Sequence, residues 1–235
     1  MSIPIIVIGR SGRGKTHSIK AFGPHEVMVI NTDGKLLPFF NQKPDMLNVP
    51  AKAAELQKRN GGAKPLKVDI IRSWLNKYHD HRAVVVDDYG FALFEIYQRY
   101  RISEDEKLSN KYAAFDIVVD KLSRQVDALA EDGDVDRIVY FVLHEETDQH
   151  GNISPLVMGK MVNDKYVLEG HVTCTLQADK VGDQYGFHTN NGNPAKSPEG
   201  LFEDEFIPND LRAIDARIRE AYGYEPLKAA EGIDS

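Results

Sequence analysis

Eight residues near the amino terminus combine glycines, a lysine and a threonine at a spacing that can hold phosphate. They fit the pattern G-x-x-x-x-G-K-[ST] and directly follow the apolar run 5–8. Glycines let successive backbone N–H groups curl round phosphate oxygens. Lys15 can reach the β and γ phosphates, and the Thr16 hydroxyl can bind magnesium. The sequence therefore predicts a phosphate loop for a nucleoside triphosphate with Mg²⁺. The loop residues are Gly9, Arg10, Ser11, Gly12, Arg13, Gly14, Lys15 and Thr16.

The segment after this loop fits the same interpretation. Residues 15–22 are predicted to start a helix whose positive N-terminal end faces the bound anion. The alternative is a glycine-rich surface turn. The order of strand, loop and helix argues against that alternative.

A second motif is the apolar run 84–86, which ends at Asp87 and Asp88. An apolar strand that delivers an acid to the carboxyl edge of a sheet is the usual partner of a phosphate loop, so Asp87 is predicted to hold magnesium. A strand-end turn acid is the alternative. The spacing from Lys15 to Asp87 leaves room for one strand and helices. It favours an ATPase core with an extra strand inserted between the two motif strands, which small nucleotide kinases and GTPases more often lack.

Two acids compete for the role of orienting the attacking water. Asp33 closes the run 29–33 on the inserted strand, where a carboxylate can polarise water at the γ phosphate. Asp88 is the rival, and we favour Asp33. The alternative for Asp33 is an Asp-Gly turn.

His144 ends a fourth apolar strand, just before Glu145. A polar side chain there can touch the γ phosphate and report hydrolysis to the irregular stretch 147–165. A solvated strand-end histidine is the alternative.

Length and composition limit the classes of protein to which the chain can belong. The chain has 235 residues, enough for one large α/β domain or two small ones, and its 42% hydrophobic and 28% charged residues indicate a globular protein. Its one cysteine, Cys174, excludes an internal disulfide and suits a reducing compartment. No run approaches the roughly 20 apolar residues of a membrane span, and the chain enters a strand at once, so we expect a cytoplasmic protein without membrane contact. The net charge of −7 does not suggest a nucleic-acid binder, although basic residues gather in 1–20 and 52–82.

Hydrophobic patterns predict alternating strands and helices, and hence a mainly parallel sheet flanked by helices in one α/β domain over 1–225. A flexible tail is predicted over 226–235. The predicted strands are 3–8, 26–31, 83–86, 138–143, 172–176 and 185–189. The predicted helices are 51–59, 68–78, 108–129 with a capping box at 103–106, and a last helix through 222 that Asn209 or Asp210 caps.

These motifs together resemble the RecA-like recombinase ATPases. The run 30–33 is similar to the family strand that ends in an acidic catalytic residue, usually glutamate, whereas Asp33 is one methylene shorter. His144 matches a position where larger recombinases carry glutamine. The stretch 147–165 falls where the family places a DNA-contacting loop.

The chain more closely resembles small bacteriophage ATPases, the minimal RecA-like single-strand annealing proteins. The resemblance rests on His144-Glu145, on Met158-Gly159-Lys160 and on the run 207–211. It implies a single RecA-like P-loop NTPase domain of the ASCE type, with ATP and Mg²⁺ bound between subunits of a ring or filament. It also implies binding of single-stranded DNA, a single-strand-binding protein or helicase as a further partner, and work in the host cytoplasm if a phage encodes the chain.

In such assemblies a neighbouring subunit commonly supplies a cation to the γ phosphate. Lys160 is our candidate, with Lys165 and Arg82 behind it, and an ordinary surface lysine is the alternative. For DNA contact, 97–101 interleaves tyrosines and arginines, as single strands require. The alternative is a helix end whose tyrosines pack inward.

The leading hypothesis is therefore a DNA-stimulated ATPase that acts on single-stranded DNA in phage-type recombination or annealing. A helicase loader or other replication-accessory ATPase would share the core but work through a protein partner. A nucleotide kinase would need an arginine-rich lid, and the segment after the fourth strand has no arginine cluster. A nucleotide-binding structural subunit with little turnover is the fourth alternative.

Overall fold

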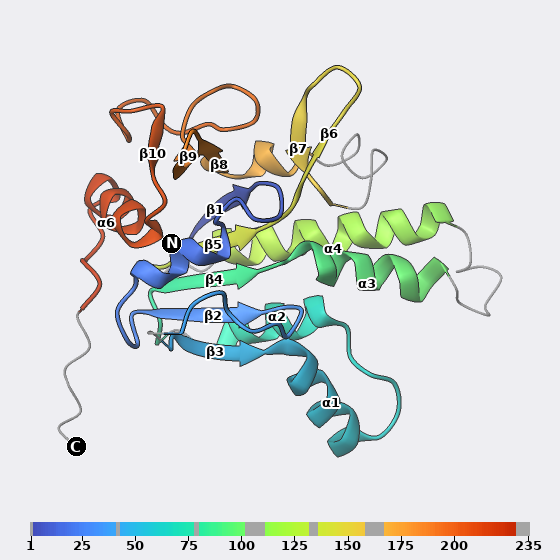
Figure 1. The fold of residues 1–235 in the computed structure, drawn as a ribbon. Helices are drawn as coiled ribbons and strands as arrows, with labels where there is room; N and C mark the ends of the chain where they lie inside the picture. Colours follow the sequence, from blue (N-terminus) through green and yellow to red (C-terminus); the bar gives the residue numbers. More distant parts are fainter. Residues whose placement is uncertain are drawn as a thin grey trace, which may run out of the picture.

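The computed structural model describes residues 2–40, 43–77, 80–101, 111–131, 136–157 and 167–228. Its centre is an eight-stranded sheet in the order β10-β9-β8-β1-β5-β4-β2-β3. Figure 1 shows β3 and β10 at opposite ends of this sheet. The strands are β1 (Ile3–Ile8), β2 (Val27–Asn31), β3 (Asp45–Asn48), β4 (Ala83–Asp87), β5 (Ile138–Val142), β8 (Cys174–Val181), β9 (Gln184–His188) and β10 (Phe206–Pro208).

The sheet is mostly parallel. Every pairing from β3 across to β8 is parallel, and only β8 with β9 and β9 with β10 are antiparallel. Strands β4 and β5 are buried along their whole length. Burial on both faces explains why these strands read as solid apolar runs in the sequence.

Helices cover both faces of the sheet. Alternate residues of β1 divide between two cores: Ile6 and Ile8 belong to one, and Ile5 and Val7 to the other. The first core contains α1 (Val49–Asn60), α2 (Lys67–Lys77), α3 (Gly90–Arg101) and α4 (Lys111–Glu131). The second contains the 3₁₀ helix η1 (Thr16–Ala21) and α6 (Leu211–Tyr222).

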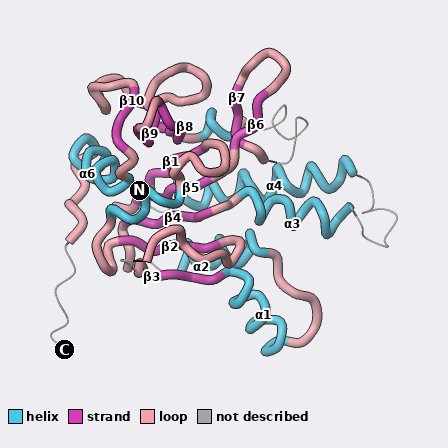
Figure 2. The backbone as a smooth tube through the Cα atoms, in the orientation of Figure 1, coloured by secondary structure: helices cyan, strands magenta, loops and turns pink. Residues whose placement is uncertain are grey.

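A small hairpin stands apart from the main sheet. It pairs β6 (Glu145–Thr147) with β7 (Ile153–Pro155) in a two-stranded sheet of its own, and Figure 2 draws these two strands in magenta and the loop that joins them in pink. A second 3₁₀ helix, η2 (Leu168–His171), precedes β8. The stretch 147–165 was predicted to be irregular, and its first part instead forms this hairpin. Residues 158–166 lie outside the described residues.

Most predicted elements are confirmed. The last helix begins where Asp210 caps it, with the carboxylate accepting a hydrogen bond from the amide of Ala213. The strand predicted at 172–176 is β8, which starts and ends later. The helix predicted after the glycine loop is only the six-residue η1. The start predicted for α4 at 103–108 lies outside the described residues. The sequence did not predict β3, β10 or α3.

One expectation about strand order is wrong. The strand that ends next to Asp33 is β2, and it does not lie between the two motif strands. It pairs with β4 on the far side from β1, and β5 lies between β1 and β4. The chain spacing shows how many strands fit between two motifs, but which strands become neighbours depends on packing across the sheet.

A buried ion pair lies within α6, and hydrogen bonds tie it to the sheet. Arg219 donates to the carboxylate of Asp215, and Tyr140 of β5 donates to the same carboxylate at 3.0 Å. The Arg219 guanidinium also donates to the backbone oxygens of Asp136 and Arg82. Because these groups satisfy its donors, the arginine can lie inside the protein.

Cys174 is buried in β8 as a free thiol, and burial raises its pKa to about 12. Across the described parts of the chain, no helix has both the length and the apolar character needed to cross a membrane.

Candidate functional site

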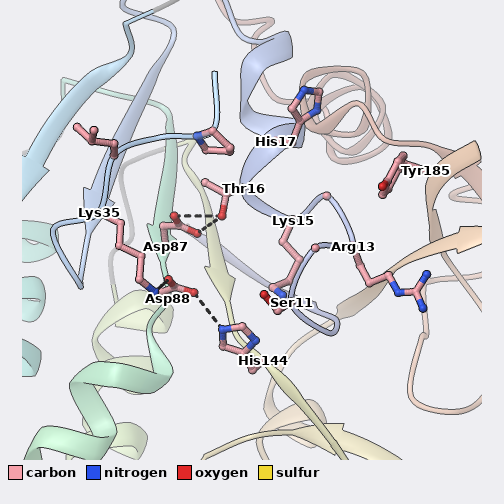
Figure 3. Close-up of a pocket in the computed structure, with 14 residues that line it drawn as sticks. Ser11, Arg13, Lys15, Thr16, His17, Lys35, Asp87, Asp88, His144 and Tyr185 are labelled. Carbon is pink, nitrogen blue, oxygen red and sulfur yellow. Dashed lines mark hydrogen bonds and ion pairs between the residues drawn. The ribbon is translucent and has the colours of Figure 1, made fainter. Parts of the chain in front are cut away.

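A cavity of about 520 Å³ opens at the carboxyl edge of the central strands. The loop before η1 forms one wall, and Lys35 with Leu36 forms another. Asp87, Asp88 and His144 lie between these walls (Figure 3). The parallel strands β1, β4 and β5 all end at this edge, which is where open α/β sheets place their ligand sites.

The predicted phosphate loop has a backbone that requires glycine. Gly9 and Gly14 have φ angles of 154° and 89°. A Cβ atom on Gly9 would lie 2.6 Å from the backbone oxygen of Ala178, and one on Gly14 would lie 2.9 Å from Nδ2 of Asn209. The loop therefore packs closely on β8 and on the start of α6, and side chains at these two positions would push it away.

Lys15 lies within the curl of this loop. Its Nζ donates to the backbone oxygens of Gly9 at 2.6 Å and Arg10 at 3.0 Å. Burial lowers the pKa of Lys15, while the charges of Asp88 and Asp87 oppose that change. The loop thus holds a cation at the wall of the cavity, with two carboxylates nearby.

Thr16 and Asp87 meet at the base of the cavity. The Thr16 hydroxyl donates to the two Asp87 carboxylate oxygens at 3.0 and 3.2 Å. Burial and, to a smaller extent, the adjacent charge of Asp88 raise the pKa of Asp87 to about 6, although the Thr16 hydrogen bond and the charge of Lys15 partly oppose them. A hydroxyl and a carboxylate are the hard oxygen ligands that Mg²⁺ prefers. A buried carboxylate with too little positive charge around it fits such an ion.

Asp88 lies between the two walls, next to Lys35 and His144. Its Oδ2 lies 3.2 Å from Nζ of Lys35, and its Oδ1 lies 3.5 Å from Nε2 of His144. Burial and the charge of Lys15 lower the pKa of His144, and Asp88 only partly opposes them. The imidazole is therefore mainly neutral at pH 7 and can exchange a hydrogen bond without carrying a charge.

Asp33, the other predicted acid, lies outside the cavity lining. Its carboxylate pairs with Lys35 at 3.1 Å and with Lys67 at 3.8 Å. The turn that follows β2 is held by the side chain of Asn31, which accepts from the amide of Gly34 at 2.7 Å. Of the two acids that we considered for orienting water, Asp88 is the one that lines the cavity.

Sequence reasoning missed Lys35. It lines the cavity with Lys15, and its ammonium also lies over the ring of Phe91, 4.7 Å from the ring centre. The available signal was its position: it follows an Asp-Gly turn after β2, and the neighbouring strand β4 carries the motif acids.

A chain of polar contacts leads from the glycine loop toward β8. Nε of Arg10 donates to one oxygen of Glu145 at 3.2 Å, and Nε2 of Gln177 donates to the other oxygen at 3.2 Å. The Glu145 side chain is buried, whereas that of Arg10 is 64% exposed. Glu145 therefore links the loop to the start of the hairpin and to β8.

The same chain continues to the tip of the hairpin. Asn191 donates to Gln177 at 3.0 Å and accepts from the amide of Asn193 at 3.0 Å. The side chain of Asn193 in turn donates through Nδ2 to the backbone oxygen of Gly151 at 3.1 Å. Its Oδ1 accepts from the backbone N–H of Ile153 at 2.8 Å. Continuous hydrogen bonds therefore connect the candidate phosphate loop with the hairpin β6–β7.

The remaining predicted residues fall elsewhere. Lys160 and Lys165 lie outside the described residues. Arg82 precedes β4, at the edge of the sheet opposite the cavity. In the stretch 97–101, Arg99 donates to the backbone oxygen of Lys64 and pairs with Glu95, and the aromatic ring of Tyr100 packs on the core. These contacts support the structural alternative for Arg99 and Tyr100.

The fold and the cavity define a mixed α/β protein with a mostly parallel central sheet, compatible with a P-loop or a Rossmann-like fold. No protein-family model matches the chain, and no curated protein matches it.

Proposed function

We propose that this chain is a RecA-like P-loop ATPase that binds ATP with Mg²⁺ and hydrolyses it while acting on single-stranded DNA in phage-type recombination or annealing. The observation that carries the proposal is the contact of Thr16 with Asp87 beside the buried Lys15. It brings together the two motifs that a P-loop enzyme needs, although they are far apart in the chain.

The strand order supports an ATPase over a nucleotide kinase. Strand β5 separates β1 from β4, and this is the arrangement expected of an ATPase core with an added strand between the motif strands. His144 follows β5 and so lies between the loop and the acids, next to the position that the γ phosphate would take.

The residues of the cavity have separate roles in the proposed reaction. The loop amides and Lys15 bind the phosphates, and Thr16 and Asp87 hold the metal ion. Bound Mg²⁺ would neutralise charge that develops on the phosphate oxygens. Asp88 orients a water molecule, whose oxygen forms a bond to the γ phosphorus as the bond to the bridging oxygen of ADP breaks. The water proton passes to Asp88 and then to solvent.

The proposal of DNA binding rests on the resemblance to the RecA-like ATPases and on the hairpin β6–β7. The hairpin β6–β7 directly follows His144, where the related ATPases place a DNA-contacting loop. The polar chain through Glu145 and Gln177 gives a strand bound at the hairpin a physical route to the loop. We therefore expect DNA to raise turnover.

Exposed apolar side chains in the segment between β2 and β3 support assembly. Leu36, which lines the cavity, is 94% exposed, and Phe40 is 90% exposed. Such exposure favours contact with another protein surface. Self-assembly into a ring or filament is the proposal, and a helicase or single-strand-binding protein on the same surface is the second candidate.

The decisive experiment measures ATP binding by calorimetry and ATP hydrolysis with and without single-stranded DNA. The wild type should bind ATP and turn over faster with DNA, Lys15→Ala should lose at least about a hundredfold in turnover, and Lys58→Ala on the exposed side of α1 should behave as wild type. A wild type indifferent to ATP refutes the ATPase. Hydrolysis without DNA affinity at low salt refutes the DNA role, and a stable helicase complex without annealing favours the second candidate.

A matched pair of variants assigns the acid. Asp88→Asn should keep ATP affinity and lose turnover, whereas Asp33→Asn should keep turnover within about tenfold of wild type, because its carboxylate lies outside the cavity lining. Lost turnover in Asp33→Asn with normal turnover in Asp88→Asn would return the role to Asp33.

A further inference from the structure

We infer that Lys35 is a catalytic residue that contacts the terminal phosphate of ATP from within the same subunit, and that this contact frees Asp88 to orient the attacking water. The inference rests on the proposed ATPase function. It assigns to this chain's own lysine the charge that the resemblance would leave to a neighbouring subunit.

The position of Lys35 supports its contact with the terminal phosphate. Its side chain lines the same cavity as Lys15 but comes from the opposite wall (Figure 3). The loop wall is expected to hold the phosphates, so an anion between the two walls would have one ammonium on each side. Charge spreads over the terminal phosphate oxygens in the transition state, and a second cation there stabilises it.

The present partners of Lys35 show how it could move. Its Nζ lies 3.1 Å from the carboxylate of Asp33 and 3.2 Å from that of Asp88. Its side chain is 59% exposed, whereas those of Asp33 and Asp88 are 30% and 15% exposed. Solvent screens the lysine side of these ion pairs, which makes them weaker than fully buried pairs. A multiply charged triphosphate would therefore compete effectively for this ammonium.

Movement of Lys35 from the carboxylates to the triphosphate would also affect Asp88. While Lys35 lies against its Oδ2 and His144 lies 3.5 Å from its Oδ1, both oxygens are engaged by the protein. Once Lys35 turns to the phosphate, the acceptor site of Oδ2 that the ammonium occupied becomes open to a hydrogen bond from water. Binding of ATP would thus complete the hydrolytic site, whereas ADP, which lacks the terminal phosphate, would leave Asp88 engaged.

A purely structural role for Lys35 is the competing explanation. The lysine could simply brace the turn after β2 by pairing with Asp33. Lys67 provides the matched control, because it also pairs with Asp33, at 3.8 Å, but does not line the cavity. If bracing were the only role, Lys35→Ala and Lys67→Ala would behave alike.

The first test compares nucleotide affinities by calorimetry. Lys35→Ala should weaken binding of a non-hydrolysable ATP analogue by about tenfold and leave ADP affinity within about twofold of wild type. Its turnover should fall by roughly 10²–10³, and Lys35→Arg should recover part of both losses. Lys67→Ala should match wild type for both nucleotides. Equal losses for ATP analogue and ADP, or none, would overturn the inference.

The second test decides between action within a subunit and action across an interface. Lys15→Ala and Lys35→Ala chains are mixed, and mixed assembly is followed by light scattering. A lysine that acts across the interface would let the Lys15→Ala subunit serve its neighbour, and the mixture would regain turnover. We expect no gain over the average of the two variants. Regained turnover would overturn the inference.

The failures are distinguishable. A wild type that binds no ATP removes the proposed function and this inference with it. A wild type that hydrolyses ATP, combined with a Lys35→Ala chain of normal turnover and normal ATP preference, removes only the role of Lys35.

Discussion

Replacing Asp87 with asparagine should stabilise the ligand-free protein and at the same time abolish its use of magnesium. Asp87 is only 7% exposed, and burial with the charge of Asp88 raises its pKa from 3.8 to about 6. An acid whose pKa rises on folding holds its proton more tightly in the folded chain. The free energy of unfolding therefore falls as pH rises from 3.8 to about 6.

The magnitude follows from the two pKa values. Their difference corresponds to roughly 3 kcal/mol, which is fully present above pH 6, about half present at pH 5 and nearly absent at pH 4. Asparagine has the same shape and no charge, and its side-chain oxygen can still accept the hydrogen bond from Thr16. Asp87→Asn should thus gain up to roughly 3 kcal/mol at pH 8, or about 5–10 °C in Tm.

The assay is urea unfolding at pH 8, 5 and 4, followed by the fluorescence of Trp74, the single tryptophan. Asp183→Asn is the control, because its side chain is fully exposed in the turn after β8. Adding ATP with Mg²⁺ should stabilise the wild type, whereas Mg²⁺ should add nothing for Asp87→Asn. The reasoning fails if Asp87→Asn is no more stable at pH 8, or if its gain does not shrink toward pH 4.

Two further predictions concern the hairpin connection and the buried ion pair. Gln177→Ala breaks the polar chain between the phosphate loop and the hairpin, so stimulation of hydrolysis by single-stranded DNA should be lost. Basal ATP hydrolysis should stay within about twofold of wild type. An ATPase assay that still shows stimulation contradicts this prediction. Asp215→Ala leaves Arg219 buried without its carboxylate, which should cost about 3–5 kcal/mol and lower Tm by roughly 10 °C. Thermal unfolding should show little change for Glu220→Ala, whose side chain is 74% exposed on the same helix. Equal Tm values for the two variants would refute the argument.

Local patterns predicted the elements that depend on local chemistry. The runs 5–8 and 84–86 are solidly apolar because their strands are buried on both faces, and the structure places strands there. Asp210 was one of the two residues predicted to cap the last helix, and its carboxylate does cap that helix. By contrast, β3 is four residues long and only partly buried, so it left no apolar pattern to recognise.

The glycine loop, the acids after the apolar run and the histidine after the fourth strand were all evident in the sequence as groups suited to phosphate and magnesium. Which of them meet was not evident, because strand neighbours are selected by side-chain packing across the sheet and not by order along the chain. That packing put β5 between β1 and β4, moved Asp33 out of the cavity lining, and brought Asp88, His144 and Lys35 together. Residue types thus determined what chemistry was available, and the tertiary contacts decided which residues share one site.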